Sequence, residues 1–398
     1  MTIKLYEVGG AVRDSLLGLP VKDKDYVVVG SNAEEMHKRG FISIGKDFPV
    51  FLHPESKDEY ALARIERKVS KGYSGFKFDV SSKVTLRQDL YRRDLTINAI
   101  ARDSEGKIYD PYNGIIDLKK KIFRHVSSSF IEDPLRILRV ARFAARFTDF
   151  KVADETEELM KKIVKSGEID SLIPERIWKE ISRGLSEKKP SRMFEVLRNC
   201  GAILKIFPDF KLFFANTENK NYYQMIRAID ICASNKKSLA IIFVTLVNYL
   251  LIQKKIIEKQ KEFISFDIKL FCKRLKVPNN IIDFAILVSR ELIEKNDFSD
   301  SPEKILSLFD RCDVYRKPER FKEFLTVCRF YEEENFFPSK IFFNLHLIEM
   351  TLQIVLSLDE GEIAKKVMKE LPSNNTKKIS VEIFNARYKL ISNFLKNK

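Results

Sequence analysis

The glycines of this chain of 398 residues are concentrated near its N-terminus, where ten of the fourteen lie between Gly9 and Gly114. The same stretch contains three short β-rich runs, Tyr26 to Val29, Val50 to His53 and Glu59 to Arg64. From about Phe130 onward helix-period patterns dominate and glycine is rare. We therefore expect an α+β fold, in which an N-terminal α/β head with a small mixed sheet is followed by an elongated, all-helical remainder.

A chain of this length with 44% hydrophobic residues can bury more than one core. No stretch approaches the roughly 20 uninterrupted apolar residues of a membrane span, and the first residues lack the apolar run of a signal peptide. The five cysteines stand singly with no C-x-x-C pair, which argues against zinc knuckles and a disulfide framework. These features predict a cytoplasmic protein with reduced thiols and no membrane association.

The net charge of +15 arises from 71 Lys and Arg against 56 Asp and Glu. Such a surplus favours a polyanionic partner, because cations that neutralise phosphates release counterions. Nucleic acid fits this charge, although basic proteins without such a partner are common.

Two helices can be placed from local signals. In "SFIEDPLRILRVARFAARF" we expect Ser129 to cap one unbroken helix with acidic residues in its first turn. In "PERIWKEISRGL" we expect Pro174 at the opening of a helix and Gly184 near its end.

Two carboxylates one residue apart stand before a run of valines in "KDKDYVVVG". In an extended strand, Asp23 and Asp25 project to the same side and repel one another unless cations lie between them. This is the geometry for two Mg²⁺ ions about 3.5–4 Å apart, which predicts phosphoryl or nucleotidyl transfer. A lone D-x-D is more often a charged turn before a buried strand, so that alternative stays open.

A pair of glycines precedes the first helical pattern. Gly9 and Gly10 would let backbone N–H groups approach a triphosphate, and Arg13 follows one turn later. Together with the nearby carboxylates, the pair strengthens the prediction of a nucleotide site.

Four arginines recur at helical spacing after Asp133. Arg136, Arg139, Arg142 and Arg146 cover about a third of a helix circumference. Planar guanidinium groups suit phosphates and base edges. An ordinary solvated arginine face is the alternative.

Four ordered stretches, "GGAVRDSLLG", "KDKDYVVVG", "RRDLTINAIA" and "EDPLRILRVARF", resemble the bacterial branch of the tRNA nucleotidyltransferase (CCA-adding enzyme) and poly(A) polymerase superfamily. The text between them, such as "GKDFPVFLHPESKDEYALARIERK", is more similar to the CCA-adding members. The resemblance extends to about Lys340.

The resemblance implies template-independent addition of CCA to the 3′ end of tRNA from CTP and ATP, with release of pyrophosphate. Poly(A) polymerase and enzymes that add only CC or only A are the alternatives within this chemistry. A non-catalytic RNA-binding module is an alternative of another class, but it would have no need of a complete metal and triphosphate site.

The resemblance also assigns roles in the head. It implies that Asp23 and Asp25 ligate the two Mg²⁺ ions and that Gly10 and Arg13 contact the triphosphate. Glu59 aligns with a third acidic position near the metals, although a surface strand glutamate is equally compatible with the sequence.

Further roles follow in the later motifs. Arg93 and Asp94 fall where the family reads the ribose and phosphates, and we expect Asn98 on the same helical face as Asp94. The resemblance implies that Asp133 and Arg136 read the Watson–Crick edge of CTP or ATP, so that protein replaces a template. Arg139 and Arg142 match further nucleotide contacts.

The implied organisation has four parts: a catalytic head (residues 1–126), a helical neck for base recognition (127–205), a body that resembles a degenerate HD domain (206–340) and a tail that contacts tRNA (341–398). Body and tail would grip the acceptor stem and TΨC arm through backbone charge and A-form shape. A monomer and a homodimer are both compatible with the sequence.

The HD-type phosphohydrolase domain that usually follows such a head needs histidines and aspartates for a divalent metal. None of the four histidines lies between Phe130 and Leu345, and "FVTLVNYLLIQ" places Asn248 and Tyr249 where a His-Asp pair would stand. An amide and a phenol cannot hold the metal in the same way, so we expect this activity to be lost.

The stretch between Ile65 and Leu86 contains Gly72 and Gly75 and few apolar anchors. It has the composition of a mobile loop, and the corresponding loop of the family helps to switch specificity from C to A. A β-hairpin is the alternative.

Overall fold

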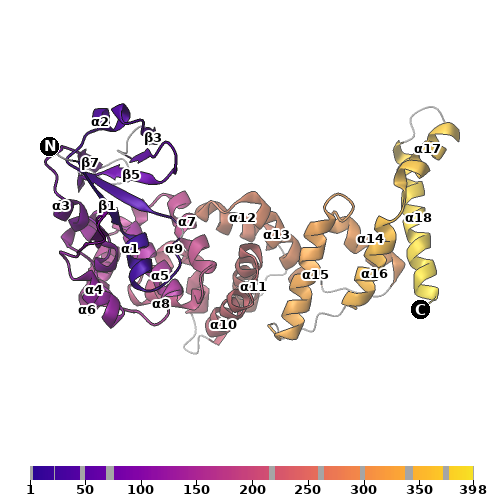
Figure 1. Cartoon of the computed structure of the whole chain (residues 1–398). Coiled ribbons are helices and arrows are strands. Elements are labelled where there is room, and N and C mark those ends of the chain that lie inside the picture. Colours follow the sequence, from indigo (N-terminus) through magenta and orange to yellow (C-terminus); the bar gives the residue numbers. More distant parts are fainter. Residues whose placement is uncertain are drawn as a thin grey trace. The chain divides into compact units, whose positions relative to one another are not determined.

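The computed structural model describes residues 3–21, 23–44, 50–68, 76–214, 220–258, 264–295, 301–336, 344–370 and 376–397. The chain forms two compact units (Figure 1). The first unit comprises Met1–Ala215 with the short segments Ile229–Leu239 and Arg274–Lys276. The second comprises Asn216–Ala228, Ala240–Lys273 and Val277–Lys398.

The first unit contains a mixed, seven-stranded sheet. Its spatial order is β3 (Ile42–Ile44), β4 (Val50–Leu52), β5 (Glu59–Leu62), β2 (Asp25–Val29), β1 (Lys4–Val8), β8 (Ala101–Arg102) and β9 (Ile108–Tyr109). Strand β2 runs antiparallel to β1 and parallel to β5. The predicted small mixed sheet is therefore confirmed.

Side chains alternate between two faces of this sheet, and each face has its own core. Val8 and Val27 belong to a cluster with Leu90 and Ala99, whereas Val28 packs with Met36 and Phe51 on the opposite face. Because side chains on a strand alternate, Asp25 shares the face of Val27. Tyr26, on the other face, stacks on Tyr60 with ring centroids 4.5 Å apart.

Nine α-helices lie wholly within the first unit among the described residues. They are α1 (Gly10–Leu16), α2 (Ala33–Lys38), α3 (Leu86–Tyr91), α4 (Gly114–Lys120), α5 (Leu135–Arg146), α6 (Asp154–Lys165), α7 (Pro174–Leu185), α8 (Pro190–Asn199) and α9 (Ile203–Ile206). Two short strands, β10 (Ile122–Phe123) and β11 (Lys151–Val152), pair in parallel. Helix α7 has the predicted bounds, with Pro174 at its first position.

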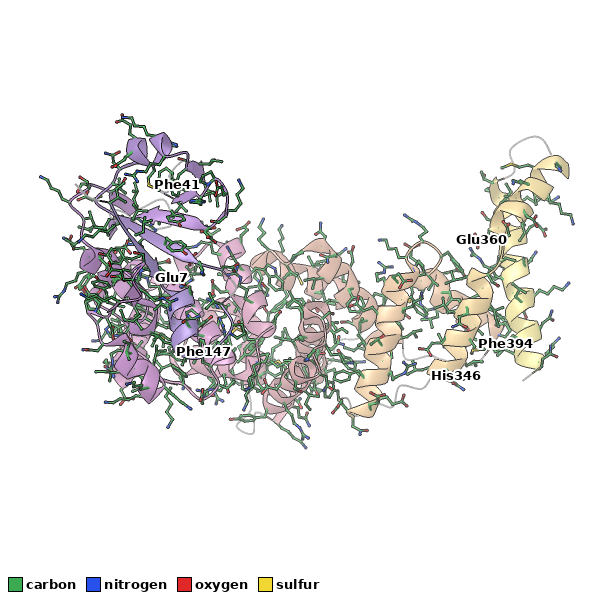
Figure 2. The ribbon with its side chains drawn as sticks, in the orientation of Figure 1. Glu7, Phe41, Phe147, His346, Glu360 and Phe394 are labelled. Carbon is green, nitrogen blue, oxygen red and sulfur yellow. The ribbon has the colours of Figure 1, made fainter. Side chains whose placement is uncertain are left out.

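The predicted unbroken helix from Ser129 is wrong. Ser128–Glu132 form a short 3-10 helix, and α5 begins only at Leu135, after Pro134. Asp133 is extended at φ −125°, the conformation that a following proline favours. Helix α5 packs against α7 and α8, and the buried Phe147 directly follows its end (Figure 2).

Strands β6 (Ile65–Lys68) and β7 (Phe76–Asp79) form a separate antiparallel pair. The β-hairpin alternative therefore holds for these strands. Residues 69–75, on which the predicted mobility centres, lie outside the described residues.

The second unit is helical throughout its described residues. Its elements are the greater part of α10 (Lys220–Ser234), α11 (Leu239–Glu258), α12 (Ile264–Leu275), α13 (Asn279–Ser289), a π-helical segment (Arg290–Lys295), α14 (Pro302–Arg311), α15 (Pro318–Glu333), α16 (Leu345–Leu356), α17 (Glu360–Glu370) and α18 (Thr376–Lys396). An α/β head with a helical remainder is thus confirmed, whereas the predicted four-part division stays a prediction.

One described helix, α11, is long and apolar enough by composition to cross a membrane. Its window Leu239–Ile256 has a mean hydropathy of 1.6, and 67% of that window is buried inside the protein. This burial accounts for the apolar composition as that of a core helix. All five cysteines are buried and unpaired in disulfides.

Candidate active site

A pocket of about 590 Å³ opens in the first unit. Nine arginines line it: Arg13, Arg64, Arg92, Arg93, Arg136, Arg139, Arg142, Arg146 and Arg176. Four carboxylates join them, Asp25, Glu59, Asp94 and Asp133, and none of the described lining residues is a lysine. A pocket with this excess of planar donors suits a ligand with several phosphate groups.

Asp25 and Glu59 are register partners on the parallel strands β2 and β5, so their side chains share one face of the sheet. Both residues are exposed, and neither side chain has a hydrogen bond or ion pair with another described residue. Partial burial raises the pKa of Asp25, Arg93 opposes this effect, and the charge of Asp23 adds to it. Two adjacent unpaired carboxylates favour a cation between them.

Asp23 does not lie within a strand, contrary to our expectation, because β2 begins at Asp25. Asp23 is exposed and is not among the residues that line the pocket, although its charge acts on Asp25. The described residues contain no group of three or more His, Cys, Asp or Glu side chains placed to hold a metal ion. Mg²⁺ commonly uses one or two carboxylates and completes its octahedron with waters and substrate phosphates, so Asp25 with its acidic neighbours fits this ion.

Gly9 caps α1 with a φ of +70°, and Gly10 is the first residue of that helix. A Cβ on Gly9 would lie 3.0 Å from Arg93 Nη1, and one on Gly10 would lie 3.5 Å from Arg13 Nη2. The absence of side chains here lets two guanidinium groups lie against the start of α1.

Arg13 is buried and held from several sides. Its Nε donates to Asp14 Oδ1 at 2.8 Å and its Nη1 to Asn98 Oδ1 at 2.6 Å. The guanidinium carbon lies 5.0 Å from the ring centroids of both Phe143 and Phe147. Burial lowers the pKa of Arg13, and the charge of Asp14 opposes this shift. The side chain is therefore fixed in direction before any ligand arrives.

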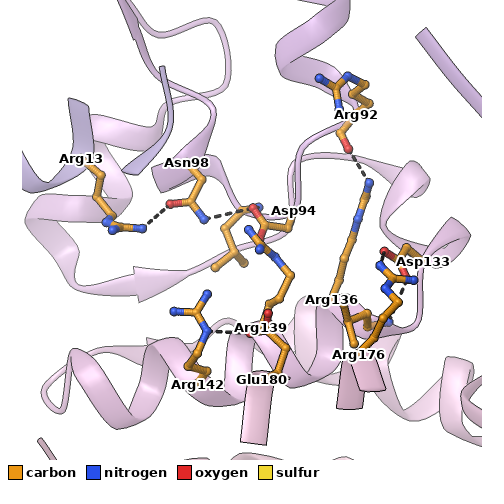
Figure 3. A network of polar contacts seen from close by, with 12 residues as sticks. Arg13, Arg92, Asp94, Asn98, Asp133, Arg136, Arg139, Arg142, Arg176 and Glu180 are labelled. Carbon is orange, nitrogen blue, oxygen red and sulfur yellow. Dashed lines mark hydrogen bonds and ion pairs between the residues drawn. The ribbon is translucent and has the colours of Figure 1, made fainter. Parts of the chain in front are cut away.

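Asp94 connects this arginine to α5. Asn98 Nδ2 donates to Asp94 Oδ1 at 3.0 Å, and Arg139 Nε donates to Asp94 Oδ2 at 2.7 Å (Figure 3). Burial alone would raise the pKa of Asp94, but Arg139 and the hydrogen bond from Asn98 outweigh it and hold the pKa far below its usual value. The expected helix around Asn98 is wrong, because Thr96–Asn98 form a 3-10 helix, yet the contact between Asp94 and Asn98 exists.

The two predicted base-reading residues lie side by side at the start of α5. Arg136 donates to the carbonyl oxygens of Ser129 and Arg92 (Figure 3). Asp133 accepts from Leu135 N at 3.1 Å and from Arg176 Nη2 at 2.8 Å. Both side chains are thus oriented by neighbours on other elements.

The remaining arginines of α5 also have buried partners. Arg142 Nε donates to Glu180 Oε2 on α7 at 2.6 Å, and Arg146 Nη2 donates to Asp14 Oδ2 at 2.8 Å. All four arginines of the predicted stripe line this pocket.

Several contributors were not identified from the sequence. Asp14, Asp89 and Glu180 are buried carboxylates behind the pocket arginines. Glu180 lies 38 residues from Arg142, and no local pattern connects them. Asp89 could have been identified from the sequence, because Arg93 follows it four residues later, the spacing of an ion pair on a helix.

Two family descriptions match the first unit. Residues 5–124 match the Poly A polymerase head domain, and residues 149–213 match the Probable RNA and SrmB- binding site of polymerase A.

Relatives match nearly the whole chain. The multifunctional CCA protein of Paraburkholderia phymatum is 45% identical over 389 residues, which cover 91% of this chain and 92% of that protein. A tRNA nucleotidyltransferase solved with a primer tRNA and an incoming ATP analog is 27% identical, covers 88% of this chain and 95% of its own, and superposes with a TM-score of 0.57. The Bacillus stearothermophilus CCA-adding enzyme in complex with CTP shares the fold, with a TM-score of 0.67, 22% identity and coverage of 98% of this chain and 89% of its own. At such identity over this length, the chain belongs to the bacterial CCA-adding enzymes, the family of the multifunctional CCA proteins.

Proposed function

We propose that the protein adds CCA to the 3′ end of tRNA from CTP and ATP without a nucleic-acid template. The observation that carries this proposal is a pocket in which nine arginines adjoin the carboxylates Asp25 and Glu59, whose side chains have no ion-pair partner among the described residues. The arginines match a triphosphate and a base edge, and the carboxylates match a cation at the reacting phosphate.

In the proposed reaction the 3′-hydroxyl of tRNA attacks the α-phosphate of the nucleotide, the bond between the α- and β-phosphates breaks, and pyrophosphate leaves. Gly10, Arg13 and Arg93 hold the triphosphate in line with the attacking oxygen. Asp94 keeps Arg139 directed at the nucleotide through its 2.7 Å ion pair. Asp133 and Arg136 select the base by hydrogen bonds.

Asp25 and Asp23, with Glu59 as a third candidate, would hold the two Mg²⁺ ions. Bound Mg²⁺ assists deprotonation of the attacking hydroxyl and stabilises the charge of the leaving pyrophosphate.

The helical neck, body and tail, residues 127–398, supply the grip on tRNA in this proposal. The surplus of Lys and Arg would hold the acceptor stem and TΨC arm through phosphates, which carry no sequence information. The cytoplasm, where tRNA is found, is the proposed location.

We also propose that the body has no HD-type phosphohydrolase activity. Asn248 is fully buried on α11, where its Oδ1 accepts a 2.5 Å hydrogen bond from Ser289 Oγ. Tyr249 is buried beside it and donates to the carbonyl oxygen of Phe336. These positions therefore serve packing. Robust metal-dependent phosphatase or 2′,3′-cyclic phosphodiesterase activity of the purified protein would contradict this proposal.

The decisive experiment incubates the protein and Mg²⁺ with tRNA transcripts that end before CCA, after C and after CC, with CTP and ATP supplied separately and together. Sequenced products that all end in CCA are expected. Long adenylate tails would instead indicate a poly(A) polymerase, and partial products would indicate an enzyme that adds only CC or only A.

Substitution of the carboxylates separates catalysis from binding. Asp25→Ala and Asp23→Ala are each expected to abolish addition while the affinity for tRNA stays within about threefold, because in the proposed reaction these carboxylates hold the cations and do not contact the RNA stem. The checks are single-turnover addition and filter binding of the same transcripts. Near-normal turnover in either variant would refute the two-metal assignment.

A further inference from the structure

One buried carboxylate behind the pocket has no role in the proposed reaction. Asp89 lies on α3, its side chain is 0% exposed, and it is surrounded by arginines. The short helix is held in place by a capping box between Thr85 and Gln88, which precedes Asp89 directly. Burial would raise the pKa of Asp89, but Arg92 and Arg93 outweigh it and lower the pKa, so the carboxylate is ionised.

The first connection runs to the triphosphate side of the pocket. Asp89 Oδ2 pairs with Arg93 Nη2 at 3.2 Å. Arg93 Nη1, on the same guanidinium, lies 3.0 Å from the position that a Cβ on Gly9 would take. The buried carboxylate thus directs the free edge of this guanidinium at the start of α1.

The second connection runs to the base-reading side. Asp89 Oδ1 accepts from Arg92 Nε at 3.0 Å and from Arg92 Nη2 at 2.6 Å. The backbone carbonyl of Arg92 in turn accepts a hydrogen bond from Arg136 Nη2 (Figure 3). Fixing Arg92 therefore also fixes the acceptor that orients Arg136.

The third connection runs to the sheet. The backbone N–H of Arg64, which follows β5 and precedes β6, donates to Asp89 Oδ1 at 3.3 Å. One carboxylate therefore joins the end of the strand that carries Glu59 to both arginines that follow α3.

We infer that Asp89 is a positioning residue for nucleotide selection, which holds Arg93 toward the triphosphate and, through Arg92, holds Arg136 toward the base. This inference rests on the proposed function for its biological meaning. The inference concerns the affinity of the protein for nucleoside triphosphates and its discrimination among them. Both quantities can be measured whether or not the protein adds CCA.

The test is Asp89→Asn, which keeps the shape of the side chain and removes its charge. The equilibrium Kd of CTP, ATP, UTP and GTP is measured in the presence of Mg²⁺, together with addition to tRNA. We expect the Kd of CTP and ATP to rise about tenfold, and the preference for them over UTP and GTP to fall by at least about threefold, because guanidinium groups without their partner adopt several orientations.

Glu291→Gln is the matched control. Glu291, in the π-helical segment of the second unit, is also 0% exposed and pairs with two arginines, Arg290 at 2.7 Å and Arg311 at 2.8 Å, but it does not line the pocket or contact a pocket arginine. A purely structural role would make the two substitutions equivalent. We expect the control to lower stability while both Kd and base preference stay within about twofold.

A double-mutant cycle tests the route of the effect. If Asp89 acts through Arg93, the losses of triphosphate affinity in Asp89→Asn and Arg93→Lys must be less than additive when combined. Additive losses, or equal effects of Asp89→Asn and Glu291→Gln on the base preference, would overturn the inference.

Should Asp89→Asn fail to fold, Asp89→Glu replaces it. This variant keeps the charge on a longer arm that cannot reproduce the present distances, so the same loss of base preference is expected. A normal Kd and normal preference in that variant would also overturn the inference. Binding that follows these expectations in a protein that adds no nucleotide would refute the proposed function alone.

Discussion

The charged side chains of the pocket form two layers. Arginines line the cavity together with Asp94, and the buried carboxylates of Asp14, Asp89 and Glu180 lie behind them and accept their hydrogen bonds. Guanidinium groups that are already oriented need little reorganisation when a triphosphate binds. The same arrangement makes individual carboxylates important for stability, because removal of one leaves a cation without its partner.

Asp94→Asn is expected to destabilise the protein at pH 7 by about 1–3 kcal/mol, less than a fully buried pair because Arg139 is partly exposed. The pKa of Asp94 is lowered in the folded state, so its stabilising effect is present above the unfolded value of 3.8 and is lost as the pH falls further. Urea unfolding of both proteins between pH 7 and pH 3 should show a gap in stability that is constant down to about pH 4 and narrows below it. A gap that stays constant over this range would contradict the assignment.

Arg136→Ala is expected to weaken the choice among nucleotides more than it slows addition, by about tenfold in the ratio of kcat/KM for CTP over UTP. The physical reason is that two backbone carbonyls hold its guanidinium near Asp133, and a bidentate base contact contributes about 1–3 kcal/mol of discrimination. Steady-state kinetics with all four nucleotides provide the measurement.

Arg87→Ala is the control for this substitution. Arg87 is an exposed arginine of α3 that does not line the pocket, so its loss should leave the ratio unchanged. An unchanged ratio in Arg136→Ala would remove its base-reading role.

At the level of elements, close approaches of the backbone position the motif around Asp94. Helix α4 packs on the 3-10 helix Thr96–Asn98 so closely that a Cβ on Gly114 would lie 2.2 Å from the carbonyl oxygen of Thr96. The contact atom is backbone and cannot turn aside. The segment that presents Asp94 and Asn98 is therefore held from behind by a helix that needs glycine at its first position.

Gly114→Ala is expected to destabilise the protein by at least about 2 kcal/mol through overpacking. Gly361→Ala in α17 is the matched control, because its Cβ would meet only the exposed carboxylate of Asp359, at 3.2 Å, and alanine favours a helix. Thermal or urea unfolding should show a large loss for the first variant and none for the second. Equal effects would contradict the close approach.

At the level of the whole molecule, net charge and apolar composition have separate consequences. The second unit buries most of α11, so the apolar residues of this helix belong to a protein core. The net charge of +15 remains available to bind an anionic partner. Affinity that depends on charge neutralisation must fall as salt competes for the phosphates.

The affinity for tRNA is expected to fall at least about 100-fold between 50 and 200 mM salt, the scale that several phosphate contacts produce. Filter binding across this range measures the effect, and tRNA that already ends in CCA serves as a control for end recognition. An affinity that does not depend on salt would contradict binding through phosphates.

Local patterns were sufficient for the parts of this protein that depend on neighbours in sequence. The α/β head, the bounds of α7 and the arginine stripe of α5 follow from periodicity and from proline, because a few consecutive residues determine them. Even there, α5 begins later than predicted, at Leu135, because Pro134 imposes an extended conformation on Asp133.

Contacts between distant segments depended on the tertiary structure. Sheet register alone brings Glu59 beside Asp25, and packing of α5 on α7 alone brings Glu180 to Arg142. The motif residues, Asp94 among them, were visible in the sequence, but the role of Asp14 and Glu180 in orienting the arginines was not. The physical reason is that an ion pair across 38 residues leaves no periodic trace, because its partners meet only after the helices that carry them have packed.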